Sequence, residues 1–249
     1  IRAPWGGSSV VVNRTQPIAL PAQVVNSTWS HRQGNNGARP QHPALSSAPQ
    51  LVWSADIGQG DARRQRLTTE PVAADGRIYT LDAGARLQAT ASNGQVIWTT
   101  DITPDWARRA SASGGGLAVA GNRLYVASAF GFLAAYDATS GAEIWRERFD
   151  SPLMGAPMVA GDRVYVSASD STLWSLDAAT GRIDWTLAAT DSISIMSRTA
   201  APALAGDLVV FPTQSGELRA VRRTNGASAW AAILAGRRVG AAYANISSV

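Results

Sequence analysis

An internal repeat is the feature of this sequence that most constrains its fold. From residue 51 onward a unit of 40 to 46 residues recurs, marked by a leucine, then a glycine, then a tryptophan four residues after that glycine. A period of about 40–50 residues is typical of β-propeller blades, each built from four short strands. The repeated positions are Leu87, Leu133, Leu173 and Leu218; Gly94, Gly141, Gly181 and Gly226; and Trp98, Trp145, Trp185 and Trp230.

The third copy, residues 156–185, shows how one unit divides into strands. Gly-Asp, Asp-Ser and Ala-Thr-Gly are turn sequences, and the stretches between them are rich in Val, Leu, Tyr and Trp. We therefore predict strands over 157–160, 163–169, 172–178 and 182–185. Trp53, in "LVWSADI", resembles the end of a further, earlier copy.

The Gly and Trp of each unit, and the Asp of the second and third units, could belong to a site or to a structural repeat. Glycine suits a turn that requires a positive φ. Asp137 and Asp177 are placed to bind the backbone N–H groups of their own turns. A tryptophan on the last strand can bury its ring against the next unit. The structural interpretation is favoured, so Trp98, Trp145, Trp185 and Trp230 are predicted docking residues between units.

Composition narrows the function classes. The 249 residues contain no cysteine, which excludes disulfides, thiolate catalysis and cysteine metal sites. All 22 basic residues are arginine, but they are scattered and the net charge is only +4, so binding to nucleic acid is not favoured. No apolar run is long enough to cross a bilayer.

Residues 1–50 differ from the rest. They hold six of the twelve prolines and both histidines, with little periodicity. We predict an extended N-terminal arm over 1–50 and propeller blades over 51–249, comprising about four copies plus parts.

The stretches "YDATSGAEIW" and "LDAATGRIDW" resemble the tryptophan-docking repeat of the pyrroloquinoline-quinone (PQQ) propeller superfamily. Within it the chain is most similar to the BamB-like lipoproteins, which serve the outer-membrane β-barrel assembly machinery of Gram-negative bacteria. Three features carry this likeness: the arm leading through "STWSHRQGNNG" to "PQLVWSADIGQG", the short cysteine-free blades, and the segment "DSISIMSRTAAPALAGDLVV".

The resemblance implies an all-β fold of four-stranded blades belonging to an eight-bladed propeller, here incomplete, so that its open blade faces would need covering. It implies a non-enzymatic scaffold without cofactor, at the periplasmic face of the outer membrane and held there through a lipid anchor upstream of this chain. The implied partners are the POTRA domains of BamA and nascent outer-membrane proteins. By the same resemblance, the residues that meet BamA are Ile193, Ile195, Met196 and Arg198.

Other interpretations stay open at this point. A PQQ-dependent dehydrogenase would need a divalent cation and a carboxylate base, whereas the repeat region has no histidine and its aspartates are mostly isolated. A different propeller-based binding protein is a further alternative, and so is a scaffold that pairs its strand edges with another chain. The segment "ISIM", residues 193–196, is either an exposed interface or the first strand of a blade packed inward.

Overall fold

The computed structural model describes residues 19–37, 40–63, 65–108, 112–189 and 200–233. These residues form sixteen strands in four antiparallel sheets of four strands each, which confirms the all-β, four-stranded-blade prediction. Among them there is no helix of the length and hydropathy needed to cross a membrane. Blade 1 contains β1 (Val72–Ala74), β2 (Arg77–Leu81), β3 (Arg86–Ala91) and β4 (Val96–Asp101), and blade 2 contains β5 (Gly115–Ala120), β6 (Arg123–Ser128), β7 (Phe132–Asp137) and β8 (Glu143–Arg148).

The two later blades have the same design. Blade 3 contains β9 (Met158–Ala160), β10 (Arg163–Ser167), β11 (Leu173–Asp177) and β12 (Ile183–Leu187), and blade 4 contains β13 (Ala203–Ala205), β14 (Leu208–Pro212), β15 (Glu217–Arg222) and β16 (Ser228–Ile233). The strands predicted for the third copy are therefore confirmed, with their ends moved by one or two residues.

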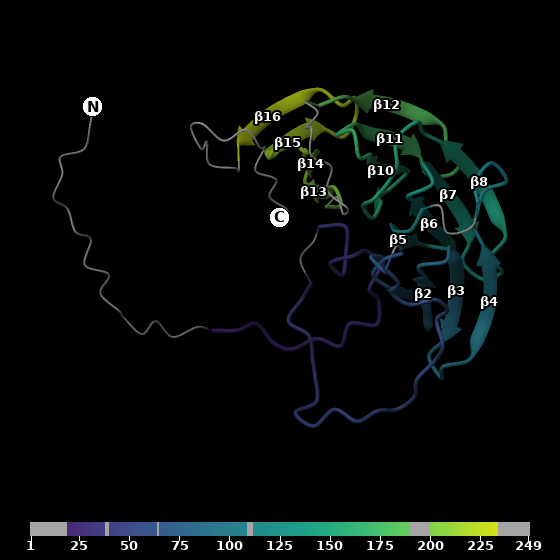
Figure 1. The fold of residues 1–249 in the computed structure, drawn as a ribbon. Coiled ribbons are helices and arrows are strands. Elements are labelled where there is room, and N and C mark those ends of the chain that lie inside the picture. Colours follow the sequence, from purple (N-terminus) through teal and green to yellow (C-terminus); the bar gives the residue numbers. More distant parts are fainter. Residues whose placement is uncertain (1–18, 38–39, 64, 109–111, 190–199, 234–249) are drawn as a thin grey trace.

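The four blades are arranged as an arc (Figure 1). Each sheet runs in chain order from its first strand, on the inner side of the arc, to its fourth strand on the outer side. The first strands of neighbouring blades contact one another, so β1, β5, β9 and β13 form the inner edge of the arc. The total of eight blades and the boundary between residues 50 and 51 both remain predictions. Within the described residues the first strand starts at Val72.

Three tight turns recur in every blade because the chain must reverse between short strands, and the first of them uses a positive φ at Gly76, Gly121, Gly161 and Gly206. The turn between the second and third strands uses a positive φ, at Ala85, Gly131, Ser171 and Gly216 in the four blades. The turn between the third and fourth strands uses the repeated glycine, with φ between 71° and 87° at Gly94, Gly141, Gly181 and Gly226. This confirms the conformational role predicted for these glycines.

The hydrophobic core lies between the blades, since successive side chains of a strand point to opposite faces of the sheet. In β6, Leu124 and Val126 pack toward blade 1, whereas Tyr125 and Ala127 pack toward blade 3. A third cluster joins blade 3 to blade 4 through Tyr165 and Phe211, among others. A blade is therefore apolar on both faces, which explains why its strands show little alternation of polar and apolar residues.

Candidate functional site

The residues predicted to bind BamA, namely Ile193, Ile195, Met196 and Arg198, lie outside the described residues. The structure describes the chain on both sides of them. Ahead of them, Leu187 and Ala189 pack against the core between blades 3 and 4, and after them β13 begins at Ala203. The predicted segment thus lies in the connection between Ala189, which packs against the core, and Ala203, the first residue of blade 4.

The predicted docking tryptophans lie on the fourth strands, next to the glycine turn of the following blade. A Cβ added to Gly141 would lie 2.6 Å from Cε3 of Trp98, and one added to Gly181 would lie 2.5 Å from Cε3 of Trp145. Trp185 meets Gly226 in the same way, at 2.7 Å. The indole therefore occupies the space that a side chain would need at the glycine.

Each of these indoles also donates a hydrogen bond to the next blade, at a carbonyl that receives a second bond from a tyrosine. Trp98 Nε1 and the Tyr79 hydroxyl both donate to the Ala138 carbonyl, at 3.2 and 3.1 Å. Trp145 and Tyr125 share the Ala178 carbonyl at the same two distances. Trp185 and Tyr165 share the Arg223 carbonyl, at 3.2 and 3.3 Å. One backbone carbonyl per junction thus joins two aromatic side chains of the preceding blade.

Trp230 stands at the same repeat position but is 42% exposed. Blade 4 also has Val210 where the other blades have the tyrosine. The far face of blade 4 therefore lacks the contact that joins the other blades, within the part of the chain that the structure describes.

The repeated aspartates act within their own turns. The Asp137 carboxylate accepts hydrogen bonds from the backbone N–H groups of Thr139 and Ser140, both at 2.9 Å. The Thr139 hydroxyl, together with the Ser140 backbone, holds the pKa of Asp137 well below its usual range. Thr180 acts in the same way on Asp177, whose pKa is also lowered. These bonds confirm the predicted turn role, in which a carboxylate stays ionised to bind its own backbone.

Residues 29–36 of the arm reach the inner edge of the arc and bond to the first strand of all four blades. Trp29 exchanges two backbone hydrogen bonds with its partner strand, and the other contacts are single bonds of 2.9–3.1 Å. The pairs are Trp29 with Ala73 in β1, Ser30 with Val119 in β5, His31 and Asn36 with Val159 in β9, and Asn36 with Leu204 in β13. A short segment of the arm therefore fastens all the described blades at their inner edge.

His31 is the buried titratable group of this segment. Its Nε2 accepts a hydrogen bond of 3.0 Å from the Val159 N–H, so the neutral ring carries its proton on Nδ1, which lies 2.8 Å from the Ser30 hydroxyl. Burial lowers the pKa of His31 from 6.5 to about 4. The ring is thus neutral at pH 7, as its role of acceptor requires.

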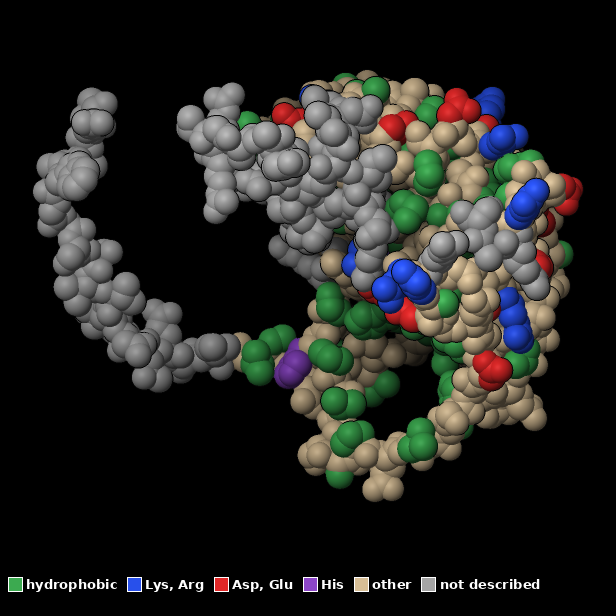
Figure 2. Space-filling view, in the orientation of Figure 1, with side chains coloured by type: hydrophobic (Ala, Val, Ile, Leu, Met, Phe, Trp, Pro, Cys, Tyr) green, Lys and Arg blue, Asp and Glu red, His purple; other side chains and the backbone are tan. Residues whose placement is uncertain are grey.

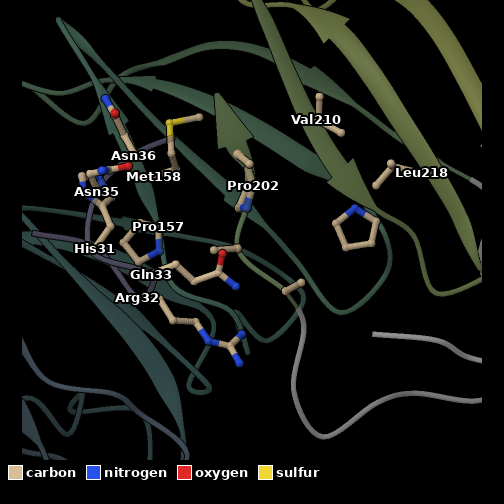
Figure 3. Close-up of a pocket in the computed structure, with 14 residues that line it drawn as sticks. His31, Arg32, Gln33, Asn35, Asn36, Pro157, Met158, Pro202, Val210 and Leu218 are labelled. Carbon is tan, nitrogen blue, oxygen red and sulfur yellow. The ribbon is translucent and has the colours of Figure 1, made fainter. Parts of the chain in front are cut away.

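A cavity of about 250 Å³ opens beside this segment (Figure 3). Arm residues form one wall, and residues of blades 3 and 4 form the other. The polar wall contains His31, Arg32, Gln33, Asn35 and Asn36, and the apolar wall contains Pro157, Met158, Val210, Pro212 and Leu218. Arg32 is already paired with Glu70, at 3.0 Å between Nε and Oε1.

Neither His31 nor Asn36 was predicted to have a role, although both lie in the stretch "STWSHRQGNNG", which is part of the resemblance to the BamB-like proteins. The signal present was a cluster of polar, hydrogen-bonding residues in an otherwise featureless arm. The part of the chain that the structure describes contains no group of three or more His, Asp or Glu side chains placed to hold a metal ion.

A family model described as outer membrane protein assembly factor BamB matches residues 85–249. Among curated proteins, BamB of Salmonella typhimurium is 28% identical over 114 residues and BamB of Alteromonas naphthalenivorans is 31% identical over 123 residues. Each match covers 44% of this chain and 29% of the relative. The chain therefore spans less than a third of the length of the curated relatives that it matches.

Solved structures give the same fold. BamB from Moraxella catarrhalis matches with a TM-score of 0.55 and 20% identity, over 71% of this chain and 51% of that one. The quinohemoprotein alcohol dehydrogenase ADHIIG of Pseudomonas putida matches with a TM-score of 0.67 and 17% identity, over 87% and 43%. At these identities the likeness shows the propeller fold alone. One fold can carry unrelated functions, so the likeness does not distinguish a binding protein from an enzyme.

Proposed function

Because the chain belongs to the outer membrane protein assembly factor BamB family, we propose that it is a non-enzymatic scaffold of the outer-membrane β-barrel assembly machinery. The observation that carries this proposal is the family match over residues 85–249, which includes blades 2, 3 and 4. Since the curated relatives are BamB proteins of Gram-negative bacteria, the proposed location is the periplasmic face of the outer membrane, with a lipid anchor upstream of this chain.

We place the contact with BamA's POTRA domains in the segment 191–199, through Ile193, Ile195, Met196 and Arg198. Aliphatic side chains beside an arginine are a frequent composition for the centre of a protein interface. The described residues on either side are held by blades 3 and 4, at Ala189 and Ala203. Substitutions within the segment should therefore change binding without unfolding the blades.

The test is a pull-down of the POTRA domains of BamA by the 249-residue chain. Arg198→Glu, and separately Ile195→Ser with Met196→Ser, should reduce recovery at least about tenfold, as expected for loss of a hot spot. Arg182→Glu is the matched control, because Arg182 is an exposed arginine on the turn ahead of β12 and should leave recovery unchanged. Equal recovery by all variants, with unchanged melting temperatures, would remove the segment from the interface.

The dehydrogenase alternative rests on the fold that quinoprotein structures share with this chain at 16–17% identity. In this chain the inner edge of the arc is bonded to arm residues 29–36. We expect no saturable binding when the chain is titrated with PQQ and calcium. Stoichiometric binding of the quinone would favour an enzyme and count against the scaffold.

A further inference from the structure

Trp106 is the most exposed aromatic side chain among the described residues, at 48%. It lies in the connection from β4 to β5, on a turn closed by a 2.9 Å hydrogen bond from the Ala107 N–H to the Pro104 carbonyl. Just ahead of the turn, Ile102 is buried and its N–H donates to the Ala85 carbonyl of blade 1. The turn is therefore held on blade 1 while its indole faces solvent.

The Arg148 side chain, from the end of β8, lies over this indole. Its guanidinium carbon is 4.6 Å from the ring centroid, a distance at which a cation and an aromatic ring attract each other. Arg148 is itself exposed, and no described residue forms a hydrogen bond or an ion pair with its guanidinium. The stacked pair thus presents an indole and a set of unbonded N–H donors side by side.

Arg146, two residues earlier in the same strand, shows the opposite arrangement. Its guanidinium also lies over an aromatic ring, at 4.2 Å, but that ring belongs to the fully buried Phe132. Its nitrogens donate to the Glu143 carboxylate and to the Tyr136 hydroxyl, at 3.1 and 3.0 Å. Arg146 is therefore satisfied inside blade 2, whereas Arg148 keeps its donors available for a partner.

Trp106 and Arg148 lie at the end of the blades where the chain runs from β12 to β13 through the segment 191–199. In an antiparallel sheet of four strands, the turn after the second strand and the connection to the next blade are at the same end. Leu187, the last residue of β12, lies at this end because it is opposite Leu173, the first residue of β11. Hydrogen bonds join these turns and connections from blade 1 to blade 4, in the pairs Ile102 and Ala85, Ala129 and Gly114, Ser169 and Pro152, and Gln214 and Ser171.

The stacked pair selects a partner by charge and by apolar contact. A guanidinium can bind a carboxylate through two parallel hydrogen bonds, and an indole packs on apolar side chains. Figure 2 shows arginine side chains along the outer rim of the described blades, and the net charge of the chain is +4. Trp and Arg are also the residue types that most often dominate binding at protein interfaces. The matching surface is a protein segment in which a carboxylate stands beside an apolar side chain.

We propose that Trp106 and Arg148 are a second contact point for the partner that binds the segment 191–199. Arg148 takes an Asp or Glu carboxylate of that partner, and Trp106 takes the apolar side chain beside it. This inference rests on the function proposed above, because it assigns both contacts to the POTRA domains of BamA. Since the turn is already held on blade 1, binding loses little conformational freedom there.

The test is the pull-down of the POTRA domains by the 249-residue chain, carrying Trp106→Ala or Arg148→Glu. Each change should reduce recovery about tenfold or more, as loss of a hot spot does. Arg148→Lys keeps the charge without the paired N–H groups, so its recovery should be intermediate. The matched controls are Trp230→Ala, at a tryptophan that is 42% exposed, and Arg182→Glu, at an exposed arginine on the opposite end of the blades. Both controls should leave recovery unchanged.

Salt dependence tests the charge at this contact. Raising NaCl from about 0.1 M to about 1 M should weaken recovery by the wild type more steeply than recovery by Arg148→Ala, because salt screens an exposed ion pair. Equal salt dependence would count against a carboxylate on Arg148.

The result for Arg198→Glu separates this inference from the function on which it rests. Full recovery by Trp106→Ala and Arg148→Glu, together with loss of recovery by Arg198→Glu, would overturn the second contact and leave the proposed function intact. Equal losses in the two controls would also overturn it. If the wild-type chain recovers no POTRA domains, the proposed function is refuted, and the second contact with it.

Discussion

At the scale of the residue, the contact between neighbouring blades depends on a glycine, which has no side chain. The glycine of the last turn in blades 2, 3 and 4 has a positive φ and lies directly under the indole of the preceding blade. Both constraints act on the same atom, because a Cβ there would meet the ring carbons of the tryptophan. Glycine is the residue that satisfies them together.

Gly181→Ala should therefore destabilise the chain by about 2–4 kcal/mol, the sum of a left-handed backbone cost and an overpacked contact with Trp145. The matched control is Gly121→Ala, which has φ of +54° and no atom within 4 Å of the added Cβ. It should cost only the backbone term, about 1–2 kcal/mol. Urea unfolding of the two variants measures the difference, and equal losses would show that the indole contact does not constrain the glycine.

At the scale of the element, the fourth strand of one blade is joined to the third–fourth turn of the next. The tryptophan contributes both a large apolar area and a hydrogen bond to the carbonyl that the tyrosine also reaches. Since the bond and the packed ring act at the same place, removing the ring should open a cavity between two blades.

Trp185→Ala should cost about 3–5 kcal/mol, as large-to-small substitutions in a core do. Trp230→Ala provides the control at the same repeat position, since Trp230 is 42% exposed and has no tyrosine neighbour in its blade. It should cost less than about 1 kcal/mol. Thermal unfolding followed by tryptophan-independent far-UV circular dichroism distinguishes the two, and a melting temperature for Trp185→Ala near that of the wild type would contradict the docking role.

At the scale of the whole molecule, the arm unites four blades that otherwise contact only their neighbours. Residues 29–36 bond to β1, β5, β9 and β13, and the bond from the Val159 N–H to His31 is one of the two links to β9. This link requires an unprotonated Nε2. The stability of the assembled chain should therefore depend on pH through one ring.

Because the folded pKa of His31 is depressed from 6.5 to about 4, the unfolded chain binds the proton more readily between these values. Stability is then full above about pH 6.5 and falls as the pH is lowered through 4, by about 3 kcal/mol at pH 4. His31→Gln keeps an acceptor for the Val159 N–H but does not titrate, so it should flatten this slope between pH 6.5 and 4.5. Urea unfolding across this range measures it, and parallel slopes for both proteins would exclude His31 as the cause.

Local features of the repeat were predictable from the sequence because they depend on local physical chemistry. The glycine, and the aspartate where a unit has one, identify the turn between the third and fourth strands. The strand-forming residues between turns identify the strands of blades 1 to 4. The same reasoning gave the position of each tryptophan on a fourth strand. The predicted contact segment 193–198 lies outside the described residues, and both that contact and the eight-blade total stay predictions.

The contacts of the arm with the blades depend on the tertiary structure alone. Its polar residues have no periodicity, so no local rule places His31 or Asn36, and their partners lie 123 and more residues away, in β9. Likewise, the sequence shows that "LVWSADI" resembles a fourth strand, but only the fold shows that Trp53 packs on Gly94 and that residues 51–57 form no backbone hydrogen bond with another described residue. Turn and strand preferences depend on residues that are neighbours in the sequence, so the sequence predicts them. The contacts of the arm and of residues 51–57 join residues far apart in the sequence, so they form only when the blades pack together.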